Sequence, residues 1–144
     1  MFEWSDFCDV ADELGKNSKE AYIRSSIDRY YYSLFGSSRE YLIKQREKYF
    51  LKRGGRDIHQ RVKDELVKSD NSNENELGEI LDKLRKYRNQ ASYDKEKFRK
   101  DYFEKILNRA EFETRTGFQS LNYLKRNPPI KRWRKWTELN KWKS

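Results

Sequence analysis

The sequence predicts an all-α fold of four to five helices. Only two of the 144 residues are proline and six are glycine, so few positions interrupt a helix. Apolar residues recur at spacings of three and four through most of the chain, which places them on one face of a helix. No segment alternates as a strand would. The chain is long enough to bury one core between several helices.

The first two helices are predicted in the N-terminal third of the chain. The first runs from about Ser5, its N-cap, to residue 14, and Gly15 ends it. The second begins near Ser18 and continues to about Phe50. Small residues on this second helix predict that a neighbouring helix approaches closely; they are Ser26, Ser33, Gly36, Ser37 and Ser38. Its predicted buried face carries Ile27, Tyr30, Tyr31, Leu34, Phe35, Ser38, Tyr41 and Leu42.

Three more helices are predicted after a pair of glycines. The third covers residues 57–68 and the fourth covers residues 74–90. The fifth begins near Lys95, with Asp94 as its N-cap, and continues to Leu124. There the sequence RNPP ends it, because two prolines cannot continue a helix. The predicted core face of the fifth helix consists of Phe98, Tyr102, Phe103, Ile106, Leu107 and Ala110.

An arginine interrupts the apolar stripe of the fourth predicted helix. Arg88 lies four residues after Leu84 and seven after Leu81, so it continues this stripe. The guanidinium group is either a helix-end side chain in a salt bridge, to Asp94 or to another helix, or a charge that faces a partner in a cleft. The apolar residues of the stripe are Leu77, Ile80, Leu81, Leu84 and Tyr87.

Positive charge is concentrated at the C-terminus. The chain has 33 basic and 24 acidic residues, a net charge of +9. Residues 125–144 contain eight of the basic residues and one of the acidic ones, so residues 1–124 are close to neutral. We therefore divide the chain into a helical domain, residues 1–124, and a basic, Trp-rich tail, residues 125–144.

The tail combines two kinds of side chain that bind RNA. Lysine and arginine contact phosphates, and indole rings stack on unpaired bases. The alternative is a terminal helix that docks its tryptophans on the domain or on a partner protein. The RNA-binding residues predicted in the tail are Lys131, Arg132, Trp133, Arg134, Lys135, Trp136 and Trp142.

Several classes of protein are disfavoured by what the sequence lacks. A single cysteine, Cys8, excludes an internal disulfide and fits a reducing compartment. The N-terminus does not resemble a signal peptide, and no segment approaches the roughly 20 apolar residues of a membrane span. We therefore expect a cytoplasmic protein. No Cys/His cluster, glycine-rich phosphate loop or carboxylate pair indicates a metal or cofactor site.

Three stretches of the sequence resemble a HEPN domain, in particular the small stand-alone HEPN proteins of prokaryotes. They are RSSIDRYYYSLF (24–35), IHQRV (58–62) and LRKYRNQASYD (84–94), and the resemblance spans roughly residues 18–110. It implies a HEPN-like bundle of four to five helices. It also implies a homodimer, in which two copies of an arginine motif face one cleft.

The resemblance also implies a chemistry for this motif. Catalytic members use an arginine, four to six residues and then a histidine to cut RNA without a metal. A base takes the proton of the ribose 2′-hydroxyl, and a fixed cation stabilises charge on the phosphate. Arg88 matches the arginine, and Asn89 matches the polar residue that often follows it and is assigned to RNA binding. Tyr93 stands where the histidine would be, and a phenol is a poor base at pH 7, although it can bind phosphate or stack on a base.

His59 is the one histidine of the chain. Its ordinary pKa of about 6.5 suits acid–base chemistry, and the resemblance matches it to a histidine often present there in the stand-alone group. Alternatively, His59 bonds locally at the start of a helix, and Tyr93 is a packing residue. The run from Tyr30 to Tyr32 fits the core, but Tyr32 or Arg29 can line the cleft.

Three functions are therefore compatible with the sequence. The first is a metal-independent endoribonuclease of the toxin or phage-defence type, with Arg88, His59 and Tyr93 as its catalytic residues. The second is an RNA-binding module that has lost catalysis and uses Arg88, Tyr93 and the tail. The third is a protein-interaction subunit, such as the partner of a nucleotidyltransferase or of a larger defence complex.

Overall fold

The computed structural model describes residues 1–93 and 99–129, with the backbone alone at residue 93. Within these ranges the chain forms five α-helices and one 3-10 turn and has no strand, which confirms the all-α prediction. The helices are α1 (Asp6–Gly15), α2 (Glu20–Lys44), α3 (Ile58–Val67), α4 (Ser72–Tyr93) and α5 (Lys100–Arg126), and the 3-10 turn η1 (Tyr49–Lys52) lies between α2 and α3.

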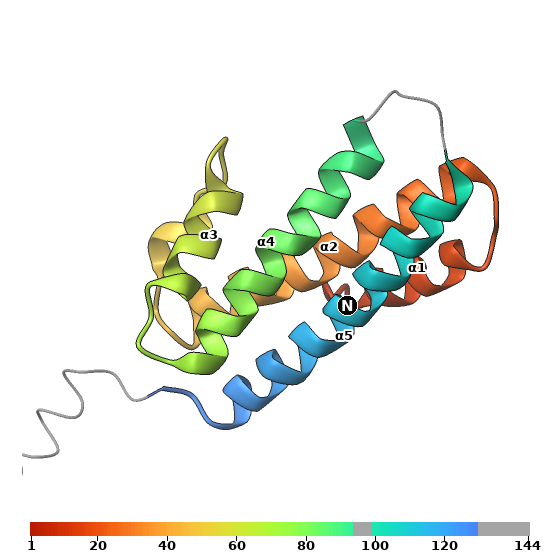
Figure 1. The fold of residues 1–144 in the computed structure, drawn as a ribbon. Helices are drawn as coiled ribbons and strands as arrows, with labels where there is room; N and C mark the ends of the chain where they lie inside the picture. The colour runs from red at the N-terminus through yellow and green to blue at the C-terminus, as the bar shows by residue number, and fades with distance from the viewer. Residues whose placement is uncertain (94–98, 130–144) are drawn as a thin grey trace, which may run out of the picture.

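Three long helices form the centre of the molecule. Helices α2, α4 and α5 pack against one another in pairs (Figure 1). The short helices lie on opposite sides of this centre, where α1 packs on α2, and α3 packs mainly on α4 and also on α2. Buried apolar side chains from all five helices make one core, as expected for a single hydrophobic core of this size.

The predicted buried face of α2 is confirmed, since all eight of its residues are buried. At Gly36, one of the small residues predicted to face a neighbouring helix, the close neighbour is instead the side chain of Trp4, which precedes α1. A Cβ atom on Gly36 would lie 2.0 Å from the ring of Trp4, and one on Gly117 of α5 would lie 2.4 Å from a methyl group of Leu34. A larger residue at either position would therefore push two elements apart.

Helix α2 ends earlier than its sequence pattern predicts, at Lys44 rather than near Phe50. The helix cannot continue, because Glu47 adopts a φ of 55°, in the left-handed region. The chain then turns back on α2, and the fully buried Leu51 joins the core. Arg39 of α2 holds this return by donating from Nε to the carbonyl oxygen of Leu51, at 2.8 Å.

Helix α4 extends to Tyr93, beyond the predicted end at Gln90. A side chain from α2 stabilises the additional turn. Arg24 Nη1 donates to the carbonyl oxygen of Ala91 at 2.9 Å, and so satisfies a helix-end acceptor that has no partner within the helix.

Helix α5 begins at Lys100 rather than near Lys95. Asp94, its predicted N-cap, and Phe98 lie outside the described residues. Tyr102 was predicted on the core face, but it is 39% exposed, so that prediction is wrong; the other described members of the face are buried.

The end of α5 agrees with the sequence pattern. The helix stops at Arg126, immediately before the segment that contains the two prolines. No helix in the described ranges is both long enough and apolar enough to span a membrane. The division into a domain and a tail remains a prediction, because residues 130–144, with all seven predicted RNA-binding residues of the tail, lie outside the described part.

Candidate functional site

Arg88 lies on α4 and is directed toward α2. Its Nε is 3.1 Å from Asp28 Oδ1, and its Nη2 donates to Tyr32 Oη at 2.9 Å. Its Nη1 donates to Asn89 Oδ1 at 3.1 Å, and the guanidinium lies 5.2 Å from the centre of the Tyr32 ring. Of the alternatives for Arg88, the structure therefore contains the salt bridge to another helix, and this explains the charge in the apolar stripe.

His59 lies in the first turn of α3 and contacts α2 rather than its own helix. Its ring stacks on Phe35, with the ring centres 4.4 Å apart, and its Nδ1 is 2.5 Å from Tyr31 Oη. The ring of Tyr32 meets it edge-on at 5.9 Å. The alternative prediction that His59 bonds locally is therefore wrong, because its hydrogen bond with Tyr31 joins α3 to α2.

Tyr32 connects Arg88 to His59. Its hydroxyl accepts the hydrogen bond from Arg88, and its ring contacts the imidazole. Arg29, the other α2 residue considered for the cleft, instead lies 4.8 Å from the ring of Phe7 of α1. We call the following residues the Arg88–His59 cluster: Asp28, Tyr31, Tyr32, His59, Arg85 and Arg88.

His59 is uncharged at neutral pH. Burial of the ring lowers its pKa to about 4, and the positive charges of Arg85, Arg88 and Arg39 contribute in the same direction. Burial also raises the pKa of Tyr31, so its phenol keeps its proton. The hydrogen bond between Tyr31 and His59 therefore joins two uncharged groups. When Nδ1–H donates to Tyr31, the other ring nitrogen of His59, Nε2, is free to accept a proton.

Three members of the cluster were not identified from the sequence as site residues. Asp28 and Tyr31 belong to the quoted stretch of α2, but only the packing shows that they contact Arg88 and His59. Arg85 precedes Arg88 by three residues, a spacing that places both on one side of a helix. Its Nη1 is 3.5 Å from Oε1 of Gln60, the residue after His59.

The remaining predicted site residues are only partly described. Asn89 is exposed and accepts a hydrogen bond from Arg88. Tyr93 is the last residue of α4, and its side chain lies outside the described part of the structure. Among the described side chains, the predicted catalytic residues Arg88 and His59 therefore belong to the cluster.

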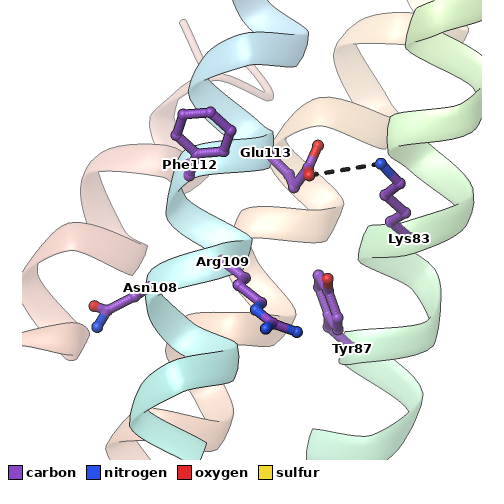
Figure 2. Close-up of a pocket in the computed structure, with 6 residues that line it drawn as sticks. All are labelled: Lys83, Tyr87, Asn108, Arg109, Phe112 and Glu113. Carbon is purple, nitrogen blue, oxygen red and sulfur yellow. Dashed lines mark ion pairs between the residues drawn. The ribbon is translucent and has the colours of Figure 1, made fainter.

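A separate hollow lies between α4 and α5 (Figure 2). Its volume is about 420 Å³, and none of the predicted site residues lines it. Lys83 Nζ is 3.8 Å from Glu113 Oε1, so an ion pair connects the two helices there. The lining residues are Lys83, Tyr87, Asn108, Arg109, Phe112 and Glu113.

The sequence was compared with protein-family models, with curated proteins and with solved structures. A family model described as HEPN domain matches residues 7–112, which is more than half of the chain and includes both Arg88 and His59. The comparisons with curated proteins and with solved structures found no match.

Proposed function

The chain belongs to the HEPN domain family, and we propose that it binds and cleaves RNA at the Arg88–His59 cluster. One observation carries this proposal: an uncharged histidine lies beside arginine side chains on a half-buried surface shared by α2, α3 and α4. Guanidinium groups bind phosphate through charge-assisted hydrogen bonds. A neutral imidazole next to them can take a proton from a bound ribose.

The proposed reaction needs no metal. His59 Nε2 takes the proton of a ribose 2′-hydroxyl, and the 2′-oxygen attacks the adjacent phosphorus. The bond from phosphorus to the 5′-oxygen breaks, that oxygen takes a proton from water, and the His59 imidazolium returns its proton to the solvent. The products are a 2′,3′-cyclic phosphate and a 5′-hydroxyl. A bound phosphate favours the imidazolium form and so raises the pKa of His59 toward the working range of a base.

A specific observation supports a second candidate, a module without catalysis. Arg88 already has Asp28 and Tyr32 as partners, and Tyr93 replaces the motif histidine. A protein of this kind binds RNA without cutting it, or serves as a protein-interaction subunit for a nucleotidyltransferase or a larger defence complex. Both candidates fit the toxin or phage-defence setting that the family resemblance implies.

The test is to incubate the purified chain with total RNA in EDTA and to map the new ends. We expect 5′-hydroxyl and cyclic phosphate ends, and a loss of at least about 100-fold for Arg88→Ala and His59→Ala. Arg109→Ala, in the hollow between α4 and α5, is the matched control and should cut normally. Undiminished cleavage by Arg88→Ala would contradict the assignment, and RNA binding without any cleavage would favour the second candidate.

We further propose that two copies of the chain bring their Arg88–His59 clusters to one cleft, because two-fold contacts are self-complementary. Light scattering at micromolar concentration should then report a dimer. A strictly monomeric protein would remove the basis for a shared site.

The tail is proposed to supply most of the long-range attraction for single-stranded RNA, since residues 1–124 are nearly neutral. If about four tail cations contact phosphates, log K falls against log salt with a slope of roughly −3 from the tail alone. Truncation after Arg126 should flatten the slope by that amount in a filter-binding titration. An unchanged RNA affinity on truncation would instead favour a tail that docks on protein.

A further inference from the structure

Arg85 and Arg88 lie one turn apart on α4, but their partners differ. Arg88 is matched by a carboxylate, Asp28, and also donates to a phenol and an amide oxygen. Both members of the ion pair are mostly shielded, since the side chain of Arg88 is 17% exposed and that of Asp28 is 22% exposed. The positive charge of Arg88 is therefore compensated within the protein.

Arg85 has no such compensation in the described ranges. Its one hydrogen bond there is the 3.5 Å contact with the uncharged amide of Gln60, and no carboxylate lies within salt-bridge distance. The nearest acidic residue in sequence, Asp82, is bound by Lys63 at 3.2 Å and by Lys86 at 3.1 Å. Arg85 therefore carries an unmatched charge beside His59.

Arg39, the third cation near His59, is directed elsewhere. Its Nε and Nη2 donate to the carbonyl oxygens of Leu51 and Lys52, where they hold η1 against α2. Arg39 therefore stabilises the fold. Of the three arginines near His59, Arg85 would break the fewest contacts within the protein if it bound a ligand.

We propose that Arg85 contacts the RNA phosphate, and that Arg88 is a positioning residue that holds Tyr32 and α2 beside His59. If Arg88 turned to a phosphate, the partly shielded Asp28 would lose its ion pair and keep only the 3.4 Å hydrogen bond from Ser92, which is unfavourable. Arg85 gives up only a long contact with a neutral amide. This inference rests on the proposed function and assigns different roles to two arginines within that site.

The test measures RNA affinity of the full chain against salt concentration, with single-stranded oligouridine as the probe. Each phosphate contact contributes about −0.7 to the slope, so Arg85→Gln should flatten the slope by about 0.7. Arg88→Gln should keep the wild-type slope, bind more weakly well below its melting temperature, and melt several degrees lower. Lys83→Gln, on the same helix and paired with Glu113 of α5 rather than with Asp82, is the matched control and should leave the Arg85-dependent contact intact.

A third variant works in the opposite direction. Asp28→Asn removes the charge that compensates Arg88, so Arg88 becomes available to phosphate and the slope should steepen by about 0.7. Melting curves identify any variant that fails to fold. If Asp28→Asn fails to fold, the Arg85→Gln and Arg88→Gln variants still distinguish the roles of the two arginines.

The outcomes separate this inference from the proposed function. A slope flattened by Arg88→Gln, alone or together with Arg85→Gln, would overturn the division of roles but keep the RNA site. A double Arg85→Gln and Arg88→Gln variant that binds RNA like the wild type would overturn the proposed function itself.

Discussion

Helix α2 contributes a tyrosine to two groups of similar chemistry, and their surroundings differ. In the first, Glu74 is 1% exposed and accepts hydrogen bonds from Tyr41 at 2.7 Å, Arg46 at 3.0 Å and Ser69 at 2.5 Å. This group joins α2 to the start of α4. Its carboxylate has donors on both oxygens and is closed to solvent, so it stabilises the fold.

The second group combines Asp28, Tyr32 and Arg88, again a carboxylate, a phenol and a guanidinium group. It is partly open to solvent, and the unmatched charge of Arg85 and the neutral His59 lie beside it. Residue types alone therefore do not separate an ion pair that only stabilises the fold from one in the proposed RNA site. The balance of charge around the pair, and its access to solvent, do.

The largest expected effect is on the closed group. Glu74→Ala leaves the buried Tyr41 hydroxyl and Arg46 without their acceptor, and we expect a loss of about 3 kcal/mol in the free energy of unfolding. Urea titration followed by circular dichroism measures it. Glu13→Ala, which breaks an exposed ion pair with Lys16, is the control and should leave the unfolding midpoint unchanged.

The open group should matter less for stability. Arg88→Ala removes a partly exposed ion pair and one hydrogen bond to Tyr32, and the expected loss is roughly 1–2 kcal/mol in the same urea titration. A loss equal to that of Glu74→Ala would make the two groups equivalent and would remove the distinction drawn between them.

The smallest expected effect is the pH dependence from His59. The folded pKa of about 4 lies below the ordinary 6.5, so the unfolded chain binds the proton first as the pH falls. The stability that His59 contributes is therefore complete above about pH 6.5 and is lost as the pH falls toward 4. Because the ring is partly exposed, we expect on the order of 1 kcal/mol or less between pH 7 and pH 5. His59→Gln should reduce this difference, and equal slopes for both proteins would contradict the prediction.

Much of the fold could be predicted from the sequence, because apolar spacing reports which side of a helix is buried. The boundaries could not be predicted as well, because contacts between distant segments set them. Helix α4 gains a turn through Arg24, and after the end of α2 at Lys44 the returning chain is held where Arg39 donates to the carbonyl oxygen of Leu51. Neither contact leaves a local sequence signal.

Two residues of the candidate site could be predicted from the sequence, but the contacts between them could not. Arg88 was identified by its place in an apolar stripe, and His59 by the resemblance. Their connection through Tyr32 depends on how α3 packs, which the sequence does not report. The proposed role of Arg85 could not be predicted for a related reason. Asp82, three residues away, is a natural partner by spacing, but Lys63 of α3 and Lys86 bind it instead.

An NMR titration of the arginine side chains and the His59 ring with single-stranded RNA in EDTA tests the proposed RNA site most directly. We expect the Nε–H signal of Arg85 and the ring signals of His59 to shift with increasing RNA, whereas the Nε–H signal of Arg46, in the closed group, should not shift. Shifts limited to the indole signals of the tail, with Arg85 and His59 unchanged, would contradict an RNA site at the Arg88–His59 cluster.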